Sequence, residues 1–324
     1  MGLNALVSES LSRLQSLKDI QLMSLAKSLS VLEPQHFPAL RSEARKRGRL
    51  LDFSTSDATK NRPSLLTSWD NRSCMVVNKP QGTVVSLDDD LKEVRIPKVR
   101  SLNARSPEIH TVISQQFPSV PILSDASFAY GILHRLDRDT TGALLVAKTY
   151  ESFFDLRLQF AARKIVKEYV CLVEGHAGEV GRWYNIKKRI ETKKLIDSAD
   201  HLSFHSKVVE IGGESACTDF MPLAIYAFKS DPSTVVTLTR VLLHTGRTHQ
   251  IRVHMASEEH PLIFDPKYGN SASSAKFFLH ANKLSFINPG SESEDCIVDV
   301  EVPQPVAFRN FIADELILIE GNPL

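Results

Sequence analysis

The sequence predicts an α+β fold in which a few helices accompany a mixed sheet. From residue 74 onward, short apolar and β-prone runs alternate with turn-forming residues, a pattern typical of strands. Between two of these runs, residues 150–163 carry apolar side chains at the spacing of an amphipathic helix. Residues 1–65 show helical periodicity instead. We therefore expect a helical extension over residues 1–65 and one main domain over residues 66–324.

The expected strands of the main domain coincide with its apolar runs. Turn residues end the first run at Lys79–Gly82, and a polar turn separates the second run from the third. The runs are Cys74–Asn78, Gly131–His134, Ala143–Ala147, Ile165–Glu174, Thr234–His244, Phe278–Ile287 and Ile297–Val302. A further helix is expected to begin within Ile251–Ser257.

The extension contains two expected helices. The first, within residues 1–20, is amphipathic and rich in serine, so it is either a mitochondrial targeting segment or a helix docked on the main domain. The second, Pro38–Leu51, carries several basic residues, which form either a solvated face or a phosphate-facing patch. The polar tract Ser54–Ser73 is expected to be a linker. Localisation stays open between mitochondrion and cytoplasm.

Composition excludes several classes of protein. With 39 Lys+Arg against 38 Asp+Glu, the net charge of +1 requires that any nucleic-acid-binding face be segregated on the surface. The four cysteines form no CxxC pair, which argues against a zinc ribbon or a disulfide scaffold. The sequence has no run of about 18 apolar residues, so we expect no membrane-spanning helix.

Two polar clusters are candidates for chemistry. The segment His134–Asp137 places an imidazole, a guanidinium and a carboxylate beside a turn, where a rigid scaffold often presents reactive groups. A surface ion pair is the alternative interpretation. The segment His244–His254 contains three histidines together with Arg247 and Arg252. Its spacing fits a metal site poorly, and the guanidinium groups favour binding of an anion.

At these two clusters the chain resembles the RluA/RluD-type RNA pseudouridine synthases. The resemblance rests on His134-Arg-Leu-Asp-Arg-Asp-Thr-Thr-Gly142 and on Thr245-Gly-Arg-Thr-His-Gln-Ile-Arg-Val-His254. Further matching segments occur in the family's order, at Asn78–Gly82, Lys167–Tyr169, Asp265–Gly269, Leu279–Ala281 and Glu301–Pro305. The chain departs from the family at Phe264, where glycine is usual, and we expect an altered turn there. Residues 1–65 do not resemble the S4 RNA-binding domain of many relatives.

The resemblance implies a fold, an activity and a set of catalytic residues. The fold would have a mixed, largely antiparallel central sheet flanked by helices. The enzyme would isomerise uridine to pseudouridine in ribosomal or transfer RNA after flipping the base out of its stack. Asp137 would be the catalytic carboxylate, paired with Arg252, and Tyr169 would stack on the target base.

The same resemblance implies the RNA contacts and the partners. Arg135 would fill the gap left by the flipped uridine. RNA contacts are also expected from Arg247, His249, Lys187 and Lys188. The reaction needs no cofactor and no metal. The expected partner is ribosomal or transfer RNA, or a ribosomal assembly intermediate, and neither DNA nor a membrane.

Two alternative functions stay open from the sequence. One is a non-catalytic RNA-binding factor in ribosome assembly, built on the same fold, since fold does not establish activity. The other is an unrelated hydrolase in which His134 and Asp137 perform acid and base catalysis. The hydrolase would leave the other matching segments unexplained, whereas the assembly factor would not.

Overall fold

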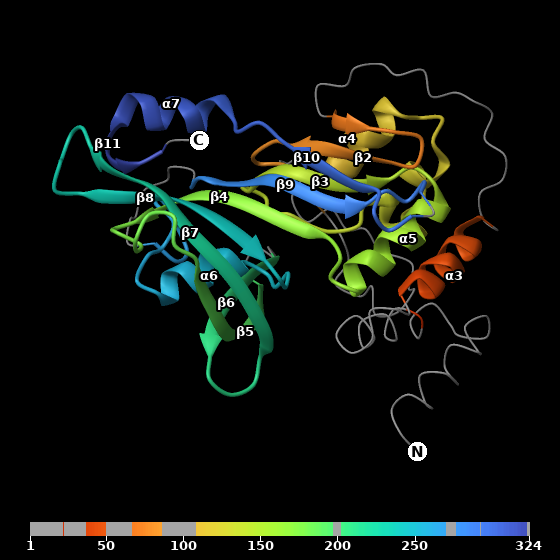
Figure 1. Cartoon of the computed structure of the whole chain (residues 1–324), viewed down its shortest axis with the longest axis horizontal. Helices are drawn as coiled ribbons and strands as arrows, with labels where there is room; N and C mark the ends of the chain where they lie inside the picture. The colour runs from red at the N-terminus through yellow and green to blue at the C-terminus, as the bar shows by residue number, and fades with distance from the viewer. Residues whose placement is uncertain are drawn as a thin grey trace.

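A computed structural model describes residue 22 and residues 37–49, 67–85, 108–196, 202–269, 277–291 and 293–322. Figure 1 shows a twisted sheet that extends through the molecule, with helices at both of its ends. The strands are β1 (Thr67–Asp70), β2 (Cys74–Lys79), β3 (Thr141–Ala147), β4 (Val166–Glu174), β5 (Tyr184–Ile196), β6 (Leu202–Val209), β7 (Glu214–Phe228), β8 (Val235–Leu243), β9 (Leu279–Ile287), β10 (Ile297–Glu301) and β11 (Leu316–Gly321). The α-helices are α3 (Phe37–Arg49), α4 (Ile109–Gln116), α5 (Tyr150–Ala161), α6 (Gln250–Ser257) and α7 (Val306–Glu315). Two 3₁₀ segments, η3 (Pro121–Ser124) and η4 (Ala126–Gly131), precede β3.

The sheet is mixed and largely antiparallel, which confirms the expected fold class. Its strand order is β1-β2-β3-β9-β4-β8-β7-β5-β6, with β10 paired to β9 and β11 to β7. Among the paired strands of the described chain, only β3 and β9 run parallel, through Thr141 opposite His280 and Gly142 opposite Ala281. This parallel contact places the start of β3 at the centre of the sheet.

Most expected strands match the observed ones, but two segments differ. Gly131–His134 forms a single bridge, Ile132 to Val146, in place of a strand. Just before this segment, Ala129 and Tyr130 have left-handed backbone conformations, with φ of 51° and 57°. These conformations turn the chain away from continuous strand pairing. In addition, residues 67–70 of the expected linker form β1, which pairs with β2.

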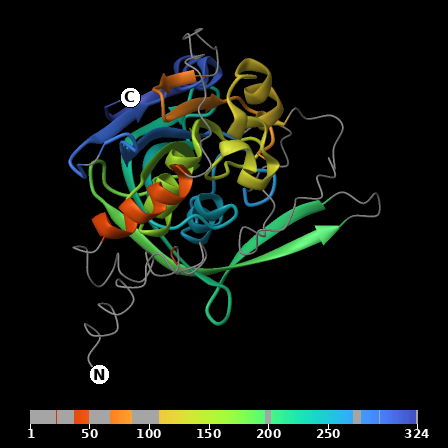
Figure 2. The ribbon, with the colours of Figure 1, turned by 90° about the vertical axis from the view of Figure 1, so that its right-hand side faces the viewer.

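Helix α3 packs against α5, and two of its basic residues, Arg41 and Arg45, face inward. Figure 2 shows the two helices side by side. Arg41 Nε lies 2.8 Å from Asp155 Oδ1, and both side chains are almost fully buried. Arg45 Nε makes a similar contact, 2.8 Å from Glu151 Oε1. The prediction of a solvated or phosphate-facing helix was therefore wrong for these two arginines, because carboxylates of α5 pair with them. The expected first helix of residues 1–20 lies outside the described residues.

Two apolar clusters hold the sheet together. The larger contains every apolar residue of β2 and β3, together with the inner faces of α3 and α5. The smaller lies between β4, β8 and α7, where Phe308 stacks on Phe278 with ring centroids 4.9 Å apart. In the described part of the chain, none of the helices combines the length and apolar character needed to cross a bilayer.

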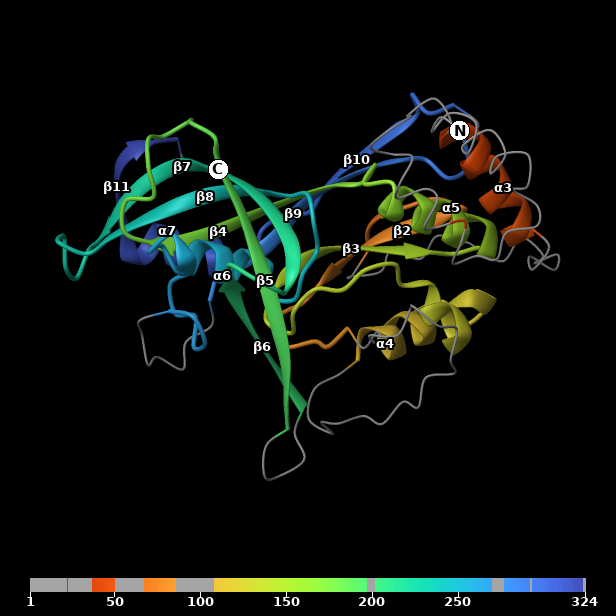
Figure 3. The ribbon, with the colours of Figure 1, turned by 90° about the horizontal axis from the view of Figure 1, so that it is seen from below.

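Strands β5 and β6 form a long hairpin that projects from the sheet, as Figures 1 and 3 show. Its second strand is fastened to the region around α6. The Ser206 amide donates to Tyr268 Oη at 2.9 Å, and the Ser206 hydroxyl donates to the Thr248 carbonyl at 2.8 Å. The base of the hairpin therefore lies beside the residues of the second polar cluster.

Candidate active site

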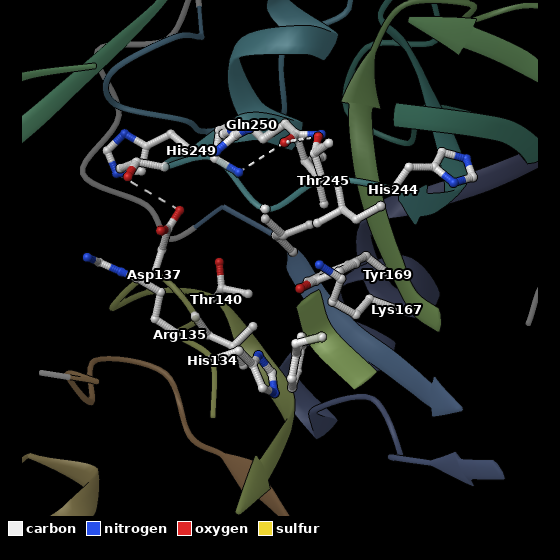
Figure 4. Close-up of a pocket in the computed structure, with 18 of the residues that line it drawn as sticks. His134, Arg135, Asp137, Thr140, Lys167, Tyr169, His244, Thr245, His249 and Gln250 are labelled. Carbon is white, nitrogen blue, oxygen red and sulfur yellow. Dashed lines mark hydrogen bonds and ion pairs between the residues drawn. The ribbon is translucent and has the colours of Figure 1, made fainter. Parts of the chain in front are cut away.

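Six of the eight predicted site residues line one cavity of about 500 Å³. Three segments form its walls: the loop before β3, the strand β4, and the chain from the end of β8 into α6 (Figure 4). The six residues are Arg135, Asp137, Tyr169, Arg247, His249 and Arg252. The tertiary structure thus brings together two polar clusters that are more than a hundred residues apart in sequence.

The loop that carries Asp137 is fixed by a buried lysine. Lys79 Nζ donates to the carbonyls of Pro80, Thr83 and Arg138 at 2.8–3.0 Å. Burial lowers the pKa of Lys79 to about 8, although the charges of Asp139 and Asp137 oppose this shift. The loop is also closed within itself, because the Thr140 amide donates to the Asp137 carbonyl at 3.1 Å. Asp137 therefore stands on a rigid turn.

Two groups from α6 and its N-terminus lie near the Asp137 carboxylate. His249 Nε2 is 3.9 Å from Asp137 Oδ2, and Arg252 Nη1 is 3.7 Å from the same oxygen. Burial lowers the pKa of His249 to about 4, so its ring is neutral at physiological pH. Its Nδ1 lies 2.8 Å from Tyr268 Oη. The 20% exposed Asp137 side chain thus faces the cavity beside one positive charge and one neutral imidazole.

Arg252 lies at ion-pair distance from Asp137, as expected, but it makes its hydrogen bonds with Asp265, which the sequence had not indicated. Its Nε and Nη2 each lie 2.7 Å from an Asp265 oxygen, and the guanidinium also packs over the rings of Tyr268 and Phe277. Burial disfavours the charge on Asp265, but its bonds to Arg252 outweigh burial and lower the pKa of Asp265. Planar guanidinium prefers such two-bond pairing. Asp137 is left at ion-pair distance with its oxygens turned toward the cavity.

Tyr169 supplies an aromatic wall from within β4. Its side chain is buried, and burial together with the Asp137 charge raises the pKa of its phenol, so the hydroxyl is protonated at physiological pH. A buried tyrosine that keeps its O–H presents an apolar face and a polar tip. This combination suits a planar, polar ligand in the cavity.

The remaining cations occupy different positions. The Arg135 guanidinium lies 5.5 Å from the Phe204 ring of the hairpin, and Arg247 pairs with Glu214 at the rim. Lys187 and Lys188 lie outside the cavity lining. Lys188 Nζ lies 2.7 Å from Glu258 and 3.1 Å from the Ser257 carbonyl, where it stabilises the end of α6. RNA contacts by these two lysines stay predictions.

The three histidines of the second polar cluster do not converge on one point. His249 contacts Tyr268, His254 Nδ1 lies 2.9 Å from Thr218 Oγ1, and His244 Nε2 lies 2.6 Å from Asp219 Oδ2. Only His244 belongs to a group of possible metal ligands found among the described residues, together with Cys217 and Asp219, within 4.8 Å of one another. Asn185 and His244 already bond both carboxylate oxygens of Asp219, so the group is satisfied without a metal.

Several residues near the cavity had no role assigned from sequence. Asp265 was noticed only as part of a matching segment, although it binds Arg252. Thr140 and Lys167 also line the cavity, and both lie in matching segments from which the sequence predicted no role for them. Phe264 adopts a left-handed φ of 61° and packs its ring against Phe311 at 5.6 Å. Glycine adopts a left-handed conformation readily, and at this position phenylalanine adopts it instead. The sequence signal for this feature was the departure from glycine at position 264.

The comparisons with known proteins agree with this architecture. A profile of the RNA pseudouridylate synthase family matches residues 73–257, more than half of the chain. The chain belongs to the RNA pseudouridylate synthase family. The human RNA pseudouridylate synthase domain containing 1 has a similar solved structure, with a TM-score of 0.54 at 22% identity over 76% of this chain and 87% of that one. This level of likeness supports the fold.

The curated relatives are bacterial enzymes of somewhat different length. Ribosomal large subunit pseudouridine synthase C of Buchnera aphidicola is 32% identical over 56% of this chain and 55% of the relative. The synthase C of Salmonella typhimurium is 29% identical over 74% and 67%. Synthase D of Nitrosomonas europaea is 36% identical over 56% and 50%. The chain therefore spans about half to two thirds of these relatives.

Proposed function

We propose that the protein isomerises uridine to pseudouridine within RNA, and that its substrate is RNA of the large ribosomal subunit. The observation that carries the proposal is the placement of Asp137 on a rigid loop, facing a cavity walled by Tyr169 and backed by Arg252. The substrate class is taken from the names of the bacterial relatives. Membership of the family supports the reaction type.

The cavity suits the demands of this isomerisation. The N1–C1′ bond of uridine must break, the uracil must turn, and a C5–C1′ bond must form. Whether a carboxylate adds to C1′ or removes the 2′ proton, it has to be ionised, and Arg252 offers a compensating charge 3.7 Å away. The protonated Tyr169 can cover one face of the detached uracil while excluding water.

The hydrolase alternative has little support from the geometry. His134 Nε2 accepts a hydrogen bond from the Leu145 amide at 2.9 Å, and Figure 4 shows its ring turned away from Asp137. Burial lowers the pKa of His134 to about 3, so its ring stays neutral. A neutral imidazole bonded to the sheet is a structural group and is poorly placed to shuttle protons for Asp137.

Tritium release from RNA containing [5-³H]uridine tests the proposal. Formation of the C5–C1′ bond expels the C5 hydrogen, so each pseudouridine releases one tritium to water. We expect release from transcripts of large-subunit ribosomal RNA by the wild-type protein and none by Asp137→Asn, which keeps the shape and removes the charge. Release from a transfer RNA pool alone would reassign the substrate. Tight RNA binding without release from any RNA would favour the assembly-factor alternative.

A further inference from the structure

Lys167 is a cavity residue that has no counter-ion among the residues that the structure describes. It lies on β4 two positions before Tyr169, and Figure 4 shows both side chains directed into the cavity. A Cβ atom placed on Gly246 would be only 3.5 Å from Lys167 Nζ, so the amine lies between β4 and the loop that leads to α6. Within the described part of the chain, no carboxylate lies within 4 Å of this amine, and no hydrogen bond engages it.

The surroundings of Lys167 make its charge costly. Burial lowers the pKa of Lys167 to about 8. The nearest acidic neighbour in sequence, Glu168, points elsewhere and pairs with Arg240 at 3.3 Å. The positive charge of Lys167 also contributes to the lowered pKa of His134. A cation that is partly withdrawn from water, with no counter-ion among the described residues, is costly to the fold, so its position in the cavity favours a ligand that compensates the charge.

A second polar group points into the same space and has no hydrogen-bond partner in the described part of the chain. Thr140 is 2% exposed, and its Oγ1 is a buried polar atom with no hydrogen bond. Figure 4 shows this hydroxyl directed between Asp137 and the tips of Lys167 and Tyr169. Buried hydroxyls normally find a partner, so an unsatisfied one beside the candidate catalytic residues needs an explanation, and a bound base would provide one. The two unsatisfied groups thus face one volume from opposite walls.

We propose that Lys167 and Thr140 bind the polar edge of the flipped uracil, Lys167 through a carbonyl oxygen of the base. This inference rests on the proposed function and names the groups that recognise its substrate. The depth of Lys167 beside the Tyr169 ring favours the base over a phosphate, since Arg247 is the cation at the rim. Uracil offers two carbonyl acceptors and one N–H donor, which an ammonium and a hydroxyl can satisfy together.

The same contact would stabilise the transition state. When the N1–C1′ bond breaks, its electron pair leaves with the base, and the negative charge spreads from N1 onto the two carbonyl oxygens. The base then forms the C5–C1′ bond, the C5 proton leaves, and N1 gains a proton, so the atoms balance. An ammonium on a carbonyl oxygen interacts more strongly with the anion than with neutral uridine, and only such differential binding accelerates the step.

Single-turnover tritium release tests this role. The variants are Lys167→Met, Lys167→Arg and Thr140→Val, with Lys229→Met as the control for loss of an exposed lysine remote from the cavity. We expect Lys167→Met to lower the rate at saturating RNA by about 10²-fold or more, with little change in half-saturating RNA concentration. Lys167→Arg should recover part of the rate, Thr140→Val should lose about 3- to 10-fold, and the control should match wild type.

Thermal melting separates this role from a structural one. Removal of a partly buried charge that has no partner among the described residues should leave Lys167→Met at least as stable as the wild type. A marked loss of stability would show that Lys167 supports the fold, and would overturn the proposal. If Lys167→Met weakens RNA binding while the rate at saturating RNA is unchanged, Lys167 would instead contact a phosphate of the RNA. If the wild type is active and Lys167→Met has unchanged kinetics, only this inference is refuted. If the wild type is inactive on every RNA, the proposed function is refuted as well.

Discussion

Replacement of Asp265 by asparagine is expected to destabilise the protein far more than the same change at Asp137. Asp265 and Arg252 share two hydrogen bonds of 2.7 Å, and their side chains are 0% and 5% exposed. Breaking such a buried pair by removing one partner costs about 3–5 kcal/mol. Asparagine keeps the shape and one acceptor oxygen, so we expect the lower end, about 3 kcal/mol.

The expected cost at Asp137 is much smaller because its geometry differs. Its carboxylate is 3.7 Å from Arg252 Nη1 and remains partly exposed. Ion pairs of this kind contribute about 0–1 kcal/mol. Asp137→Asn should therefore lose the proposed activity while it retains nearly the full free energy of unfolding. Both aspartates contact Arg252, so each of the two variants serves as the control for the other.

Urea unfolding followed by tryptophan fluorescence measures both costs. With a slope of about 3 kcal/mol per molar urea, a loss of 3 kcal/mol lowers the midpoint by about 1 M. The double variant Arg252→Met with Asp265→Leu should recover most of this stability, because an apolar pair can replace a buried ion pair. It should still lack activity. Equal midpoints for Asp265→Asn and Asp137→Asn would refute the assignment of Asp265 as the partner of Arg252.

Three further predictions follow from buried groups elsewhere in the fold. Arg41→Met removes the nearest cation from the buried Asp155, which keeps only Gln159 and the more distant Arg45, so it should cost about 3 kcal/mol in urea unfolding, whereas an exposed, phosphate-facing Arg41 would show almost no cost. Burial lowers the pKa of His254 from 6.5 to about 4. The free energy of unfolding should therefore fall by about 2–3 kcal/mol for this group as the pH drops from 6.5 toward 4. His254→Gln should flatten this part of a plot of stability against pH. Gly142→Ala should prevent folding or lower the melting temperature sharply, because its Cβ would lie 2.3 Å from the Ala281 carbonyl oxygen and its φ is 106°; wild-type melting would show that β3 and β9 can separate there.

Local sequence predicted β2, β3, β4, β8, β9 and β10 and the two halves of the candidate site, but it gave no expectation of β5, β6, β7 or β11. Apolar runs between turn residues predicted β4 and β8 nearly to their ends, because burial of alternating or continuous apolar side chains specifies a strand locally. The segment around Asp137 and the segment around Arg252 were both identified as chemical clusters. The prediction failed at Gly131–His134, where left-handed residues just upstream, which no composition signal marks, interrupt the ladder.

Partners of buried charges were decided only by the tertiary structure. Arg252 was expected to pair with Asp137 and does lie at ion-pair distance from it, but a turn after α6 also brings Asp265 to it at hydrogen-bond distance. Arg41 belongs to a basic run for which sequence alone predicts either a solvated or a phosphate-facing surface, and it is buried because α5 offers a carboxylate more than a hundred residues away. Sequence specifies which residues carry charge and which segments are apolar. The tertiary fold determines which opposite charges meet away from water. In that low-dielectric environment the electrostatic interaction between them is much stronger than at the surface.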